Sequence, residues 1–113
     1  MEIIKEKITR ARLKELAQEK FGDFVKGVVD LERKILAVDA ELHADLEALL
    51  LERGSQQSDL WGINLYPEAQ GLDFVEFDSM INVRPSQGNR SRGVESEETR
   101  SRILSVVDRK VAR

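Results

Sequence analysis

The spacing of apolar residues predicts a helix near each end of the chain. Close to the N-terminus, the short apolar run Ile3-Ile4 precedes Thr9, a good helix N-cap. Apolar residues then recur at helical spacing as far as Gly22, which predicts a helix over residues 10–21. Near the other end, Ser96 is the expected N-cap of a second helix, whose apolar stripe comprises Ile103, Leu104, Val107 and Val111.

The segment between these helices has the composition of β-strands. Residues 24–31 and 35–38 are rich in β-branched side chains and are separated by charged residues, which is typical of a hairpin. Residues 59–66 form a further β run, and Pro67 ends it because proline cannot continue a sheet ladder. The middle of the chain is therefore predicted to contribute antiparallel strands.

Two further segments decide where the polar side chains lie. Residues 74–83 alternate most clearly, which predicts a strand with Ile81 and Val83 in the core. Residues 42–52 are ambiguous, because their leucines fit a helix while their alternating Leu and Ala residues fit a strand. We favour the strand for this segment.

The order of elements predicts an α+β fold, in which an antiparallel β-sheet carries an N-terminal and a C-terminal helix packed on one face. The 113 residues are typical of a single domain, which we take to span 1–113. The absence of cysteine excludes a disulfide framework, a thiolate nucleophile and a cysteine-based zinc site. No apolar stretch has the length of a membrane span and the N-terminus lacks a signal peptide, so we expect a cytoplasmic protein.

Charge is distributed unevenly along the chain. The net charge of −3 does not favour general nucleic-acid binding. Guanidinium and amide groups nevertheless gather at the end of the predicted strand 74–83 and in the next loop, and they could bind a phosphate or carboxylate: Asn82, Arg84, Gln87, Asn89, Arg90 and Arg92. The structural alternative is that Asn and Gly satisfy turns while Arg84 pairs with Asp78 or Glu76. We expect residues 88–95 to be the most mobile internal segment.

The second polar cluster surrounds the single histidine. In a strand, His43, Asp45 and Glu47 share one face, whereas a helix leaves His43 and Glu47 as neighbours. Such a cluster can supply a general base held by an acid, or metal ligands, although a solvated strand face is the structural alternative. The candidate catalytic residues are His43, Asp45, Glu47 and Arg84, and the spacing matches no established metal motif, so we predict no metal and no cofactor.

These strand assignments predict one shared surface. His43, Asp45, Asn82 and Arg84 should lie on the sheet face that the two helices leave uncovered. The carboxylates there should raise the pKa of His43 above its ordinary value.

Three stretches of the sequence carry a resemblance to a known family: Glu41-Leu42-His43-Ala44-Asp45, residues 49–62 and residues 81–91. They resemble a small prokaryotic family known as domain of unknown function 5674. The resemblance implies no activity, but it draws attention to the segments that hold His43 and Arg84. The chain departs from the family at Asp39-Ala40, where members usually carry a glycine pair, so the turn there should have no absolute requirement for positive φ, although aspartate tolerates it.

Three functions fit these observations. The first is a small ligand-binding or enzymatic domain with a polar site on the sheet face for a small anionic ligand. The second is an interaction protein with a small protein partner, as in a toxin–antitoxin-like module, whose RNase variant would use His43 and Arg84. The third is a homodimer in which the exposed sheet face is the interface.

Overall fold

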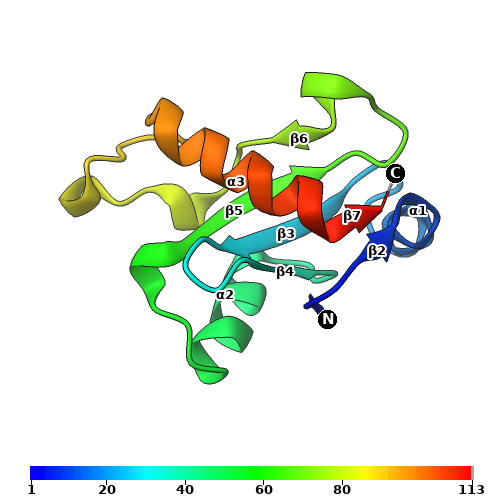
Figure 1. The fold of residues 1–113 in the computed structure, drawn as a ribbon, viewed down its shortest axis with the longest axis horizontal. Helices are drawn as coiled ribbons and strands as arrows, with labels where there is room; N and C mark the ends of the chain where they lie inside the picture. Colours follow the sequence, from blue (N-terminus) through cyan, green and yellow to red (C-terminus); the bar gives the residue numbers. More distant parts are fainter. Residues whose placement is uncertain (113) are drawn as a thin grey trace.

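The protein is an α+β domain built on an antiparallel sheet (Figure 1). The structure is a computed structural model and describes residues 1–112. The five strands of the main sheet in this part of the chain follow the order β1-β4-β3-β5-β6. Their bounds are Glu2–Ile4 for β1, Val25–Asp30 for β3, Ile35–Val38 for β4, Leu60–Leu65 for β5 and Val75–Glu76 for β6.

The two predicted terminal helices pack on one face of this sheet, around a core of aliphatic side chains from β3, β4 and β5. Helix α1 (Arg10–Glu19) is capped by Thr9, whose hydroxyl accepts the Arg12 N–H at 3.0 Å. Helix α3 (Glu97–Lys110) is capped by Ser96 in the same way. The strands that flank these helices, β2 (Ile8–Thr9) and β7 (Val111–Ala112), pair in parallel. Within residues 1–112, no helix combines the length and apolar character that crossing a membrane requires.

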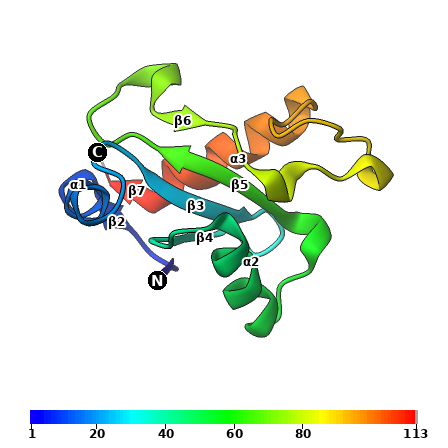
Figure 2. The same cartoon turned by 180° about the vertical axis from the view of Figure 1, so that it is seen from behind.

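The predicted strand at residues 42–52 is a helix, α2 (His43–Glu52), and it covers the second face of the sheet. It lies in front of the strands in Figure 2, whereas α3 lies in front of them in Figure 1. The strand prediction was wrong because the Leu and Ala residues fit the spacing of a helix as well as the alternation of a strand. The helix buries Leu46 and Leu50 completely against a second apolar cluster formed by Val28, Ile35, Ala37, Ala40 and Leu60.

The predicted strand at residues 74–83 is also wrong beyond Glu76. A 3₁₀-helix, η3 (Met80–Asn82), replaces it and crosses β5 at Gly62. The Asn82 side-chain amide forms the hydrogen bonds with the Gly62 backbone that a neighbouring strand would form. Its Oδ1 accepts the Gly62 N–H at 2.8 Å, and its Nδ2 donates to the Gly62 carbonyl at 2.9 Å. A Cβ at Gly62 would lie 2.5 Å from the Ser79 side chain, so glycine permits this close approach.

Residues 88–95 are held by a dense set of hydrogen bonds, which contradicts the predicted mobility. The Asn89 side chain is 3% exposed and donates to the carbonyls of Asn82, Ser91 and Gly93. The Glu95 carboxylate accepts the N–H groups of Arg90 and Ser91, and these bonds hold the pKa of Glu95 below its ordinary value. Amide and carboxylate side chains therefore replace the apolar contacts that this segment lacks.

The turn after β4 adopts a positive φ at Asp39, a residue type that was expected to tolerate this conformation in place of glycine. Asp39 has a φ of 77° and accepts a hydrogen bond from Lys20 Nζ at 2.8 Å. Aspartate tolerates the left-handed region better than most residues, which explains how the chain forms this turn without glycine.

Candidate functional site

A cavity of about 470 Å³ opens on the second face of the sheet, beside the N-terminus of α2. We call it the His43 cavity. Its polar lining includes His43, Asn64, Glu76, Asp78, Lys26 and Arg92. Its apolar lining includes Phe24, Leu42, Met80 and Ile81.

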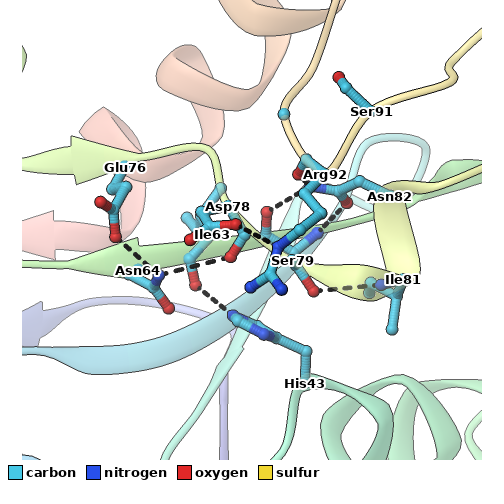
Figure 3. Close-up of polar contacts among 12 residues, drawn as sticks. His43, Ile63, Asn64, Glu76, Asp78, Ser79, Ile81, Asn82, Ser91 and Arg92 are labelled. Atoms are coloured by element: carbon cyan, nitrogen blue, oxygen red, sulfur yellow. Dashed lines mark hydrogen bonds and ion pairs between the residues drawn. The ribbon is translucent and has the colours of Figure 1, made fainter.

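The backbone of β5 fixes the protonation of His43. The ring is 7% exposed, and Nε2 lies 2.8 Å from the carbonyl oxygen of Ile63 (Figure 3). Because a carbonyl only accepts, Nε2 must carry the proton, and Nδ1 is then the nitrogen with a lone pair in the neutral ring. The bond to Ile63 uses Nε2, and the Asn64 side chain also interacts with the ring and acts to raise its pKa. The neutral ring therefore offers one acceptor at a fixed position.

The environment of His43 lowers its pKa from the ordinary value of 6.5. Burial is the largest cause and the Lys26 charge acts in the same direction, while the Ile63 carbonyl, Asn64 and Asp78 oppose them. The prediction of a raised pKa was wrong, because α2 buries the ring where the strand would have left it solvated. At neutral pH the imidazole is uncharged.

We expect the His43 resonances to titrate below pH 6.5 in an NMR pH series. The folded state then binds fewer protons than the unfolded chain just below that pH, so the free energy of unfolding should decrease as the pH falls through this window. His43→Gln keeps a donor for the Ile63 carbonyl and should remove this part of the pH dependence. A titration midpoint above 6.5 would contradict the proposed environment.

A ladder of polar side chains crosses three neighbouring strands on this face. Lys26 of β3 pairs in register with Asn64 of β5, which pairs with Glu76 of β6. The Asn64 amide donates to Glu76 Oε1 at 2.9 Å, and the Tyr66 hydroxyl donates to the same oxygen at 2.9 Å. Burial and the Glu76 carboxylate raise the pKa of Tyr66 to about 12, so the phenol stays protonated and keeps this bond.

Arg92 enters the cavity from the loop that follows η3. Its Nε donates to Asp78 Oδ1 at 2.6 Å, and no hydrogen bond from its two terminal amino groups is formed within residues 1–112. In the view of Figure 3, the end of the guanidinium group lies between Asp78 and His43. The ion pair with Asp78 therefore orients the arginine while leaving a pair of donors free.

The family model for the protein of unknown function DUF5674 matches residues 2–110. The chain belongs to the DUF5674 family. The matched range includes every residue that lines the His43 cavity of this DUF5674 protein, and it confirms the resemblance seen in the sequence. Comparison with curated proteins and with solved structures finds no match.

Arg84 lies outside the His43 cavity of this DUF5674 protein. Its side chain is 8% exposed. The guanidinium donates to the Ile81 carbonyl at 2.9 Å and also to the Leu60 carbonyl. Glu47 Oε2 lies 3.7 Å away, and the guanidinium carbon lies 4.8 Å from the centre of the Trp61 ring. Burial lowers the pKa of Arg84, and the Glu47 charge opposes the effect. These contacts join η3 to β5 and α2.

The other candidate residues are dispersed. Asp45 is exposed and lines a different cavity with Lys20 and Asp39. Asn82 and Asn89 are buried and form the backbone hydrogen bonds described above. Gln87 donates to the Ser58 carbonyl at 3.3 Å, and the Arg90 side chain is exposed. The prediction that His43, Asp45, Asn82 and Arg84 share an uncovered sheet face is wrong, because α2 and η3 cover that face.

Of the residues that accompany His43 in the cavity, Arg92 was among the anion-binding candidates predicted from the sequence, whereas Lys26 and Asn64 were not predicted. Lys26 and Asn64 are polar positions inside otherwise apolar strand runs, and that interruption was the available signal. The structure shows that they are neighbours across β3 and β5. Within residues 1–112 no group of His, Asp and Glu side chains is arranged to hold a metal ion.

Proposed function

We propose that this DUF5674 member is a cytoplasmic ligand-binding domain that holds the anionic group of a small molecule in the His43 cavity. The observation that carries the proposal is the Arg92 guanidinium, which is oriented by Asp78 through Nε and retains two terminal amino groups beside the cavity. Two parallel N–H donors match the two oxygens of a carboxylate or phosphate.

Two further features favour an anion in this place. Lys26 lines the same cavity, and among the described residues its ammonium makes no ion pair, although it lies 5.1 Å from the centre of the Phe21 ring. The N-terminus of α2 also opens here, and Leu42 at the N-cap provides no side-chain acceptor. The positive end of the helix dipole then adds to the attraction for negative charge.

The contacts of Arg84 do not favour the RNase alternative. That mechanism needs the Arg84 guanidinium to clamp a phosphate beside His43. The guanidinium is instead buried against Leu60, Ile81 and Glu47. Freeing it would leave the Glu47 charge without its partner in a poorly solvated position.

The proposal is tested by titrating inorganic phosphate and 4-methylpentanoate into the protein while following the His43 resonances by NMR. We expect saturable shifts with at least one of these probes, and Arg92→Gln should weaken binding about tenfold or more, since it removes a charge-assisted pair of bonds. Arg90→Gln is the matched control, because Arg90 is exposed on the same loop and does not line the cavity. Equal effects of the two substitutions, or no shift with either probe, would overturn the proposal.

A further inference from the structure

We infer that the ligand of the His43 cavity is a zwitterion with an apolar side chain, that is, an apolar amino acid or a close analogue. The inference rests on the proposed function and specifies its ligand class. It follows from the part of the cavity lining that a simple anion would leave unused.

The cavity presents acceptors as well as cations. Glu76 and Asp78 both line it, and in each carboxylate a single oxygen makes the hydrogen bonds found within residues 1–112. The Nδ1 atom of neutral His43 adds another acceptor in the same cavity. A ligand carrying an ammonium group would supply donors to these atoms, whereas a plain carboxylate would pair with Arg92 and Lys26 but leave these acceptors without donors.

The charges of the lining cancel. Lys26 and Arg92 balance Glu76 and Asp78, while the imidazole is uncharged at neutral pH. A cavity of zero net charge that contains separated charges of both signs is complementary to a ligand with the same property. An α-amino acid has this arrangement of charges within a few ångströms.

The apolar part of the lining provides a place for a side chain. Leu42 is 57% exposed and Met80 is 65% exposed, and both border the cavity together with Phe24 and Ile81. Exposed apolar side chains beside a polar cavity of about 470 Å³ are typical of small-molecule sites, where the apolar contacts give affinity and the polar groups give orientation. The ligand side chain would cover these residues.

The test uses two sets of matched probes. The first is leucine, 4-methylpentanoate, which lacks the ammonium, and 3-methylbutylamine, which lacks the carboxylate. The second is phenylalanine, 3-phenylpropanoate and 2-phenylethylamine. Binding is followed by NMR through His43 and the Met80 methyl group, with calorimetry for the dissociation constants. We expect at least one amino acid to bind about tenfold or more tightly than both of its partial analogues, because each analogue leaves charged groups of the site unpaired.

Glu76→Gln separates the contribution of the ammonium group. Glutamine keeps an oxygen for Asn64 and Tyr66 but loses the charge, so amino acid binding should weaken while binding of the carboxylate analogue should not. Asp78→Asn provides a second test from the other acid, and Glu98→Gln is the control, because Glu98 is an exposed residue of α3.

Each other result has a defined meaning. If 4-methylpentanoate binds as tightly as leucine and 3-phenylpropanoate as tightly as phenylalanine, the zwitterion inference is overturned while the anion-binding function stands. If the amines bind as tightly as the amino acids, both fail. If no probe in the two sets binds, the inference is overturned, and the phosphate titration decides the function separately.

Discussion

Substituting Asn82 with alanine is expected to lower the free energy of unfolding by about 2 to 6 kcal/mol. The Asn82 side chain is fully buried and makes two hydrogen bonds to the backbone of Gly62 and one to the Arg92 carbonyl. Its removal leaves the Gly62 N–H and C=O without their partner, and each unsatisfied buried polar group costs about 1 to 3 kcal/mol. Chemical denaturation of the two proteins under the same conditions measures the difference.

Met80→Ala is the control for this experiment. Met80 lies in the same 3₁₀-helix, but its side chain is 65% exposed, so its loss should cost less than about 1 kcal/mol. If Asn82→Ala costs no more than Met80→Ala, the amide of Asn82 does not complete the edge of β5 in the way the structure indicates. Because Asn82 also holds the Arg92 carbonyl, we expect its loss to loosen the loop that carries the Arg92 side chain into the cavity.

Leu46→Ala is expected to destabilise the protein by about 2 to 5 kcal/mol, the range for a large-to-small change in a packed core. Leu46 is completely buried between α2 and the second face of the sheet. The truncation would leave a cavity beside rigid strand residues that can close it only in part. Thermal or denaturant unfolding provides the measurement.

Leu42→Ala distinguishes the helix from the strand in this segment. In a strand, Leu42 and Leu46 would share one buried face and their truncations would cost similar amounts. In the helix, Leu42 is the N-cap and is 57% exposed, so its truncation should change stability by about 0.5 kcal/mol or less. Similar losses for both variants would show that residues 42–52 do not form the helix.

Local signals in the sequence were sufficient for the terminal helices and for the hairpin. Thr9 and Ser96 cap helices through hydrogen bonds to N–H groups three residues ahead, so the evidence for each start lies within one helical turn. The runs that became β3, β4 and β5 contain β-branched residues between turn or charged segments, and each strand was predicted within a few residues. The α+β class and the packing of α1 and α3 on one face follow from that order.

The candidate site could be predicted in part. His43 was identified because it is the single histidine and has acidic neighbours in the sequence, and it does line the cavity. Its accompanying residues Asn64 and Glu76 were not identified, because they come from different strands and meet only through sheet register. Asp45 was included on the basis of strand periodicity, and the helix turns it toward a different surface.

The sequence by itself determined the elements whose signals are local: the two capped helices, the hairpin and β5. The tertiary structure decided the two segments that satisfy more than one local pattern. Residues 42–52 fit both the helical and the strand spacing, and in the folded protein they form a helix whose Leu46 and Leu50 pack against the apolar second face formed by Val28, Ala37 and Leu60. Asn82 continues the alternation of apolar and polar residues that predicts a strand. Its amide instead forms hydrogen bonds with the Gly62 backbone, 20 residues away in the sequence, and the segment forms a 3₁₀-helix there. Both outcomes depend on burial and hydrogen bonding between distant residues, which outweigh local propensities of a few tenths of a kcal/mol.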